Sequence, residues 1–286
     1  MNQLLNQPVP STLTGRVKSS VLSFLHTAGI PATRNDFRVH SLKNLHRGRR
    51  AFVIGNGPSL RVADLDRLKN EVTFASNKIF LAFDQTSWRP TYHFIEDENV
   101  LKGSADLLRG FRHQLFLSRL ALQFMERLPT AIYYSINWKT DHRNPAFEYH
   151  PYGRTFAGFS VLYTCLQFAF FMGIETLYFL GVDQSYTPSG KVVTLAPAPE
   201  AINGGKGTPV YEAAGEVNHF HKDYYKPGEL WFDPNLEFQQ AGFESAKRVF
   251  ASHRRSIYNA TRGGQLEVFD RRDFDSLFSS NAKPVL

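Results

Sequence analysis

A tight glycine turn after a short apolar run offers the clearest chemistry in this sequence. The apolar run covers residues 51–54, and the turn reads Gly55-Asn56-Gly57-Pro58-Ser59. Glycine has no side chain, so it permits positive φ and lets a ligand approach the backbone closely. Ser59 is typical of a residue that begins a helix, where free N–H groups point toward a bound phosphate. The pattern predicts a phosphate-binding turn, and an ordinary strand-to-helix turn is the alternative.

The turn differs from the dinucleotide fingerprint. That fingerprint needs a third glycine at position 60, where the chain has Leu60, and an acid about 20 residues further on for the ribose. Ser76 and Asn77 stand there instead. An NAD-dependent function is therefore disfavoured.

Three further polar residues stand beside apolar runs. Asn77 and Asp183 come two and three positions after the runs 72–75 and 176–180, and open parallel sheets bind ligands at the carboxyl ends of their strands. Asn77 can hydrogen-bond a base or ribose, and Asp183 can accept from sugar hydroxyls or hold a metal. Arg154 precedes a predicted helix that ends at Met172, so its guanidinium and the helix N–H groups can converge on one phosphate. A turn-forming Asn, an Asx turn and a surface cation are the structural alternatives.

A region rich in glycine and proline interrupts the regular pattern. Between positions 188 and 234, 12 of 47 residues are Gly or Pro, and loops this long are often lids over a site. His219 and His221 lie within it, two positions apart, so on an extended segment both rings would face the same side. Either imidazole can accept a proton from a hydroxyl near neutral pH.

Three consecutive acids follow another apolar run. Glu96, Asp97 and Glu98 come after residues 92–95, and carboxylate oxygens at a ligand-facing strand end are suitable for Mg²⁺. A solvated acidic turn before a helix is the alternative.

Seven short apolar runs alternate with helical segments along the chain. Continuous apolar runs indicate strands buried on both faces, so we predict a Rossmann-like α/β fold with an open, mainly parallel sheet, helices on both faces and a long lid loop. We expect an N-terminal basic and amphipathic extension at 1–48 and a transferase domain at 49–280, with the lid at about 187–234. The predicted strands cover residues 51–54, 72–75, 92–95, 114–117, 131–134, 176–180 and 256–258, and a further strand is expected at 266–269 before a short helix near 274–278.

Composition excludes several classes of protein. The 286 residues carry 33 basic and 26 acidic side chains, a net charge of +7, and 42% are hydrophobic, which excludes a disordered chain. The single cysteine, Cys165, excludes an internal disulfide, and its place among apolar residues indicates a core position. No signal peptide is evident, and the apolar stretch 168–182 is too short to cross a bilayer. We expect a soluble cytoplasmic protein.

The surplus of positive charge is concentrated between Arg34 and Arg50, which include six basic residues and one acid. Upstream, apolar residues at 17, 21, 24 and 25 have helical spacing. A solvated approach to the first strand is one interpretation, peripheral contact with the inner face of a membrane is another, and a non-catalytic module that binds RNA or membrane is a third. We expect no specific nucleic acid as a partner of an enzyme.

Several blocks between residues 50 and 275 together resemble two related families. One comprises bacterial sialyltransferases that use CMP-activated sialic acid, with the motility accessory proteins that modify flagellin. The other is the MptE-like family, similar to archaeal 6-hydroxymethylpterin diphosphokinase. The blocks are Gly55 to Leu60, Asp64 to Leu68, Phe74 to Asn77, Arg154 to Gly158, Gly181 to Tyr186, Asn218 to His221 and Ile257 to Gly264.

The resemblance implies a nucleotide-dependent transferase. The first interpretation is a glycosyltransferase that takes a CMP-activated sugar, needs no metal and modifies a glycan or protein acceptor during surface glycan assembly. It implies His221 or His219 as the base, although an ungapped alignment puts Asp223 there, and Arg154 at the leaving phosphate. The nucleotide would be held by Gly55, Asn56, Gly57, Ser59, Asn77, Ala157, Gly158, Asp183 and Tyr186.

The alternative is transfer of diphosphate from ATP to a pterin alcohol, with Mg²⁺ on Asp97 and Asp183. The sialyltransferases carry asparagine where this chain has its acidic triplet, so the acids favour this second activity.

Overall fold

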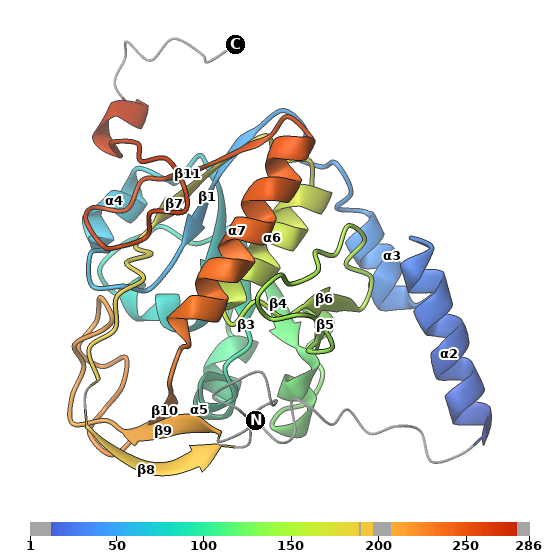
Figure 1. Cartoon of the computed structure of the whole chain (residues 1–286), viewed down its shortest axis with the longest axis horizontal. Coiled ribbons are helices and arrows are strands. Elements are labelled where there is room, and N and C mark those ends of the chain that lie inside the picture. Colours follow the sequence, from blue (N-terminus) through green and yellow to red (C-terminus); the bar gives the residue numbers. More distant parts are fainter. Residues whose placement is uncertain (1–12, 189, 197–206, 279–286) are drawn as a thin grey trace.

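The computed structural model describes residues 13–188, 190–196 and 207–278. Its centre is a sheet of eight parallel strands in the spatial order β11-β7-β1-β2-β3-β4-β5-β6 (Figure 1). The predicted α/β fold is confirmed, and so are the seven strands predicted between residues 51 and 258. Strand β6 was not predicted. The strands are β1 (Arg50–Ile54), β2 (Val72–Ser76), β3 (Tyr92–Ile95), β4 (Gln114–Ser118), β5 (Ile132–Asn137), β6 (Arg154–Phe156), β7 (Thr176–Leu180) and β11 (Ser256–Asn259).

Strand β1 shows why the apolar runs are continuous. Successive side chains of a strand point to opposite faces. Ala51 and Val53 pack into the core on one face, while Phe52 and Ile54 pack into a separate core on the other. Because both faces are covered, each of the four positions must be apolar.

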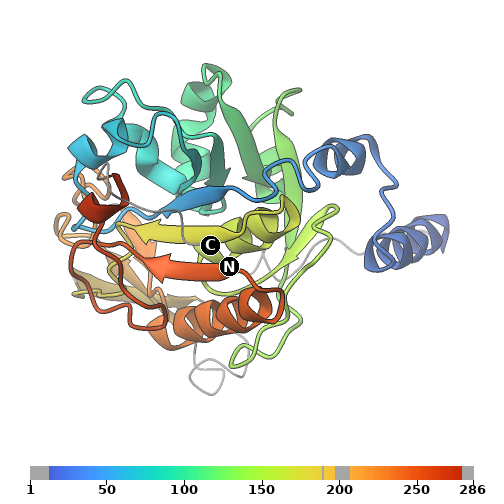
Figure 2. The ribbon, with the colours of Figure 1, turned by 90° about the horizontal axis from the view of Figure 1, so that it is seen from above.

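Helices cover both faces of the sheet. On one face lie α6 (Val161–Phe171) and α7 (Leu236–Ser252), which pack against each other and over the central strands (Figure 1). Figure 2 shows the smaller helices on the opposite face. These are α4 (Val62–Asp66), α5 (Glu98–Arg109) and the 3₁₀ helices η1 (Asn77–Ala82) and η2 (Arg119–Gln123).

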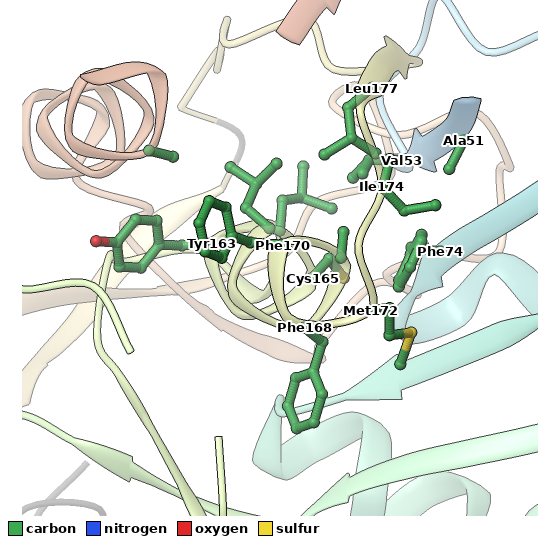
Figure 3. Packing of buried hydrophobic residues seen from close by; sticks show 14 of the residues in the cluster. Ala51, Val53, Phe74, Tyr163, Cys165, Phe168, Phe170, Met172, Ile174 and Leu177 are labelled. Atoms are coloured by element: carbon green, nitrogen blue, oxygen red, sulfur yellow. The ribbon is translucent and has the colours of Figure 1, made fainter. Parts of the chain in front are cut away.

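Helix α6 is the centre of the largest core. Its residues 162–171 are all buried, which is typical of a helix surrounded by other elements. Figure 3 shows Cys165 and Phe168 directed from it toward the sheet, and Met172 just after its end in the same core. Cys165 is fully buried, as its apolar neighbours predicted. Full burial of each large apolar side chain stabilises the folded state by about 1.5 to 3 kcal/mol relative to leaving it exposed.

The predicted lid contains regular structure where a loop was expected. Strands β8 (Lys191–Ala196), β9 (Thr208–Glu212) and β10 (Leu230–Phe232) form a small antiparallel sheet. It lies below the end of the parallel sheet in Figure 1. Positions 189 and 197–206 of the predicted lid are outside the described residues.

The C-terminal segment corrects one strand prediction. Residues 266–269 form no strand, although Leu266 and Phe269 are buried against the main core. These positions are apolar because they belong to a loop that packs against the main core, and not because they form a strand. The short helix predicted near 274–278 is present as η4 (Asp275–Phe278).

Two helices precede the sheet, α2 (Leu13–Thr27) and α3 (Arg34–His40). Helix α3 begins with a capping box formed by Thr33 and Asp36. The Asn35 side chain both donates to and accepts from the backbone of Tyr133, which attaches α3 to β5. Helix α2 is joined to α3 through His26 and Asp36, whose nearest side-chain atoms are 2.9 Å apart. Within the described ranges, no helix has the length and apolar character needed to span a membrane.

Candidate functional site

A cavity of about 290 Å³ opens between the carboxyl ends of the parallel strands and the small antiparallel sheet. Its walls come from segments far apart in the chain. They are 55–57 after β1, 76–77 at the end of β2, 96–98 after β3, 136–138 at the end of β5, 157–164 before and within α6, 181–186 after β7, and parts of 218–239.

The cavity lies where the order of strands reverses. From β1 the chain adds strands on one side as far as β6, and then crosses to place β7 on the other side of β1. The chain after β1 leads to α4 on one face of the sheet, and the chain after β7 leads, through the antiparallel sheet, to α7 on the other face. Open α/β sheets bind their ligands at such switch points, so the topology itself marks this cavity as a binding site.

The two glycines of the first turn let it pack against the turn after β7. A Cβ on Gly55 would lie 2.5 Å from the carbonyl oxygen of Gly181, and one on Gly57 would lie 2.0 Å from Asp183 Oδ2. The Gly57 N–H donates to the Gly181 carbonyl at 2.9 Å. Glycine is thus required by packing between these turns, whether or not a ligand approaches them.

Ser59 does not start a helix, which corrects the sequence prediction. The following helix, α4, begins at Val62 and has five residues. The Ser59 hydroxyl donates to Asp183 Oδ2 at 2.8 Å, and its N–H lies 3.3 Å from the same oxygen. The Asp183 carboxylate therefore occupies the place at Ser59 predicted for a phosphate, and Ser59 itself does not line the cavity.

Asn56 presents an unpaired acceptor at this end of the cavity. Its Nδ2 donates to the carbonyl and hydroxyl oxygens of Ser76, each at 3.0 Å. Its Oδ1 is buried and has no partner. Because an unsatisfied buried oxygen is costly, a ligand that donates a hydrogen bond here would relieve that cost.

Asn77 lies beside Asn56 at the end of β2 and also lines the cavity. Its φ of 43° is left-handed. The Asn77 Oδ1 accepts from the Glu96 N–H at 3.3 Å, and its carbonyl lies 2.7 Å from His93 Nε2. These contacts fix Asn77 between β2 and β3, where its amide faces the site.

The N-terminus of α6 also opens into the cavity. Ser160 caps the helix by accepting from the Leu162 N–H, and residues 160–162 line the wall. The partial positive charge of a helix N-terminus favours an anion. Ala157 and Gly158 lie just before it, and a Cβ on Gly158 would lie 2.4 Å from the Tyr163 ring.

Left-handed backbone is concentrated around the cavity. Among described residues other than glycine, six have positive φ, and three of these line it: Asn77, Phe159 and Gln184. Such conformations cost about 1 to 3 kcal/mol each and gather at functional sites. Phe159 is held there by edge-to-face contacts with Trp138 and His142.

Arg154 precedes α6 in the chain, as expected, but it does not share the cavity with the N-terminus of that helix. It begins β6, an edge strand, and its guanidinium contacts Glu148 and the hydroxyls of Ser23 and Thr27 on α2. It does not line the cavity. The sequence prediction placed Arg154 at the site because it is near the start of α6 in the chain. In the structure the edge strand β6 directs its side chain toward α2 instead.

His219 lies in the cavity wall with its imidazole oriented from two sides. The ring stacks on Tyr224 with centroids 3.7 Å apart. Its Nδ1 is 3.0 Å from Glu216 Oε1, an ion-pair distance at which the ring N–H is not aligned for a full hydrogen bond. Its Nε2 is 3.5 Å from the hydroxyl of Tyr186. A base held by a carboxylate beside a hydroxyl is the general arrangement of acid-base catalysts.

Glu216 is a candidate functional residue that the sequence analysis missed. Its side chain is 3% exposed and accepts from the N–H groups of Asn218 and Tyr225. Burial opposes its ionisation, but the contacts with His219 and the backbone lower its pKa overall. An ionised carboxylate therefore stands behind the imidazole.

Tyr186 completes this wall. Burial raises the pKa of its phenol well above the usual range, so the hydroxyl keeps its proton. The aromatic surface continues into Tyr225 and Trp231, whose rings stack on neighbouring residues of the lid. This wall offers flat apolar surface next to one titratable ring.

His221 lies outside the cavity, so the two histidines do not share a side. Residues 218–225 form bends and a turn, and the His221 Nδ1 is 3.9 Å from Asp223 Oδ2. Asp223, the other base suggested by the resemblance, also lies outside the cavity, where Lys222 lowers its pKa. Only His219, among these three, lines the cavity.

The acids after β3 face the cavity from its far side. Burial raises the pKa of Glu96 to about 7, and its Oε1 accepts from the Tyr134 hydroxyl at 3.1 Å. The Asp97 Oδ1 caps α5 through the Val100 N–H, and burial raises the pKa of Asp97. Glu98 pairs with Lys102 on the same helix.

These acids form no ready cage for a cation. In the described ranges, no group of three or more His, Cys, Asp or Glu side chains is placed to hold a metal. Their oxygen donors nevertheless suit Mg²⁺, which proteins often bind through one or two carboxylates together with substrate phosphates.

Fold and cavity define an α/β protein with a candidate ligand site at the switch point of a parallel sheet. The family model described as "6-hydroxymethylpterin diphosphokinase MptE-like" matches residues 30–189, more than half of the chain. The protein therefore belongs to the MptE-like family, whose name implies a kinase or another transferase. No curated protein and no solved structure gives a significant match.

Proposed function

We propose that this protein is a nucleotide-dependent transferase whose donor is a CMP-activated sugar and whose acceptor is a hydroxyl of a glycan or protein in surface glycan assembly. The observation that carries the proposal is the pairing of two features in one cavity. Asn56, with its unpaired amide oxygen, lies at the sheet end, and His219, held by Glu216, lies in the lid wall.

The sheet end provides groups that match a nucleoside. Asn56 Oδ1 needs a donor, such as a base amino group or a ribose hydroxyl. The indole Nε1 of Trp138, which lines the same cavity, is buried without an acceptor. An occupant that both donates and accepts would satisfy both atoms, and the N-terminus of α6 suits its phosphate.

Charge distinguishes between donors. Among the described residues that line the cavity there is no Lys or Arg, whereas five are acids: Glu96, Asp97, Glu98, Asp183 and Asp233. Like charges repel strongly where water is scarce. A CMP-sugar, with one phosphodiester, suits such a site better than a bare triphosphate does.

The lid suits proton removal. In the proposed step an acceptor hydroxyl oxygen forms a bond to the anomeric carbon, the bond from that carbon to the phosphate oxygen breaks, and CMP leaves with the electron pair. The hydroxyl proton passes to His219 Nε2, and the Glu216 carboxylate stabilises the resulting imidazolium. The antiparallel sheet excludes water, which would otherwise hydrolyse the donor.

The lid is already attached to the body. The Phe220 N–H donates to the Asn56 carbonyl at 2.9 Å, and Asn99 Nδ2 donates to the Leu230 carbonyl at 2.9 Å. Lys78 donates to the Tyr224 carbonyl. The first of these bonds couples the nucleotide end of the site directly to the segment that carries His219.

A diphosphokinase is the second candidate, and the acids after β3 favour it. Glu96 and Asp97 would hold Mg²⁺ together with the phosphates of ATP. The ion would neutralise phosphate charge that the described protein groups leave unbalanced. In this reaction His219 would accept the proton of a pterin alcohol.

The test combines binding with turnover. Thermal unfolding is followed with CMP, CDP, UDP, GDP and ATP, with and without Mg²⁺, and release of CMP from CMP-sialic acid is measured with and without EDTA. Stabilisation by CMP without metal, and CMP release that requires His219 but survives His253→Gln on the surface, support the sugar transferase. Stabilisation by ATP with Mg²⁺ alone, with loss of activity in EDTA, favours the diphosphokinase.

A further inference from the structure

Helix α2 exposes a row of apolar side chains. Val17, Val21 and Phe24 are 57%, 53% and 71% exposed. Their spacing of four and three residues places them along one face of the helix. Figures 1 and 2 show α2 projecting from the body, with α3 between it and the sheet. Exposed rows of this kind are unusual in a soluble protein unless something covers them.

Exposed apolar residues are concentrated in this part of the chain. Of the 13 large hydrophobic side chains that are exposed among the described residues, six lie between residues 17 and 45. Besides the row on α2 they are Ile30, Phe37 and Leu45. Exposed apolar side chains are therefore concentrated in and around the N-terminal helices.

The charge of the same region has one sign. Helix α2 contains basic residues and no acid, and the acid of α3, Asp36, is buried against His26. Two basic residues are engaged internally, Arg38 on backbone carbonyls and Arg50 on Glu71. The others of the basic segment are exposed and form no ion pair with another described residue: Arg34, Lys43, Arg47 and Arg49.

We propose that α2 and the exposed basic residues between 34 and 49 form a docking surface for an anionic membrane. Apolar side chains of an interfacial helix enter the headgroup region, and basic residues near it are attracted to acidic lipids. The row on α2 supplies the first element and the basic segment supplies the second. This surface is separate from the cavity. Docking would therefore place the protein at a membrane without involving the residues of the proposed transfer reaction.

The alternatives fit these observations less well. A second copy would bring the same positive charges together, and one row of three side chains is far short of the roughly 800 Å² per partner of a stable dimer. RNA would attract the basic residues, but proteins bind its bases through stacking aromatic rings. The row contains one aromatic residue and two valines.

Sedimentation of the full chain with vesicles tests the proposal. Vesicles of phosphatidylcholine are compared with vesicles that also contain phosphatidylserine. We expect binding to the anionic vesicles only, and weaker binding as salt is raised. In Val17→Ser/Val21→Ser/Phe24→Ser, affinity should fall about tenfold or more. Each neutralisation, such as Arg34→Gln or Lys43→Gln, should lower it about fivefold.

Matched controls separate docking from folding. Leu107→Ser and Leu122→Ser remove exposed apolar side chains from other helices and should leave vesicle binding unchanged, and all variants should unfold at a similar temperature. Equal binding of the wild type and the triple apolar variant would overturn the proposal. A dimer in solution that is lost in the triple apolar variant would also overturn it. So would binding of RNA that anionic vesicles do not displace.

Discussion

Glu96 gives the sharpest stability prediction, because the structure places its half-buried side chain in the cavity wall. Burial raises its pKa from 4.5 to about 7, with the Tyr134 hydroxyl as a hydrogen-bond partner. Between these two values the folded chain keeps a proton that the unfolded chain releases. The contribution of Glu96 to the free energy of unfolding is therefore full below pH 4.5 and is lost as the pH rises through about 7. The loss amounts to about 3 kcal/mol.

Glu96→Gln removes this titration while keeping an oxygen that can accept from Tyr134. We expect the variant to match the wild type in stability near pH 5 and to exceed it by up to about 3 kcal/mol near pH 8. Urea unfolding across this range measures both proteins. The difference between the two proteins is the decisive quantity, because each also contains buried His93 and half-buried His113, with pKa values lowered to about 3 and about 4, whose titration changes stability in the opposite direction.

An exposed carboxyl supplies the control. Glu237 pairs with Arg143 at the surface, so Glu237→Gln should change stability by less than about 1 kcal/mol at any pH in the range. A difference between Glu96→Gln and the wild type that stays constant with pH would refute the reasoning. Lower stability of the variant near pH 8 would refute it as well.

Three further predictions concern the cavity. Glu216→Gln keeps an oxygen for one of the two backbone N–H groups but removes the charge beside His219, so kcat should fall about a hundredfold with donor KM unchanged; a fall in donor affinity alone would contradict a positioning role. Gly57→Ala should displace Asp183 and lower stability by about 1 to 3 kcal/mol in urea unfolding, and an unchanged midpoint would disprove the close packing. Arg154→Gln should leave nucleotide affinity unchanged in calorimetry, whereas a large loss would return this residue to the site.

The parallel sheet could be predicted because burial on both faces leaves a strong signal in sequence. Runs such as 51–54 and 176–180 are apolar at nearly every position. Strand β6 gave no such signal, since its three residues include an arginine and lie at the edge of the sheet. The lid strands were missed because glycine and proline around them hide any alternation.

The site could be predicted only where topology decides it. Asn56, Asn77 and Asp183 follow strands of one parallel sheet, so their convergence is a consequence of the fold. Glu216 is one acid in an irregular segment, and its role depends on a turn that no periodic pattern marks. The direction in which the Arg154 side chain points, toward α2 and away from the cavity, also depends on tertiary structure.

A crystal structure of the protein with CMP tests the central claim most directly. We predict the nucleotide in the cavity between the carboxyl ends of the parallel strands and the small antiparallel sheet, with a hydrogen bond to Asn56 Oδ1 and its phosphate near the N-terminus of α6. Nucleotide bound outside this cavity, or an Asn56 oxygen that stays without a partner in the complex, would contradict it.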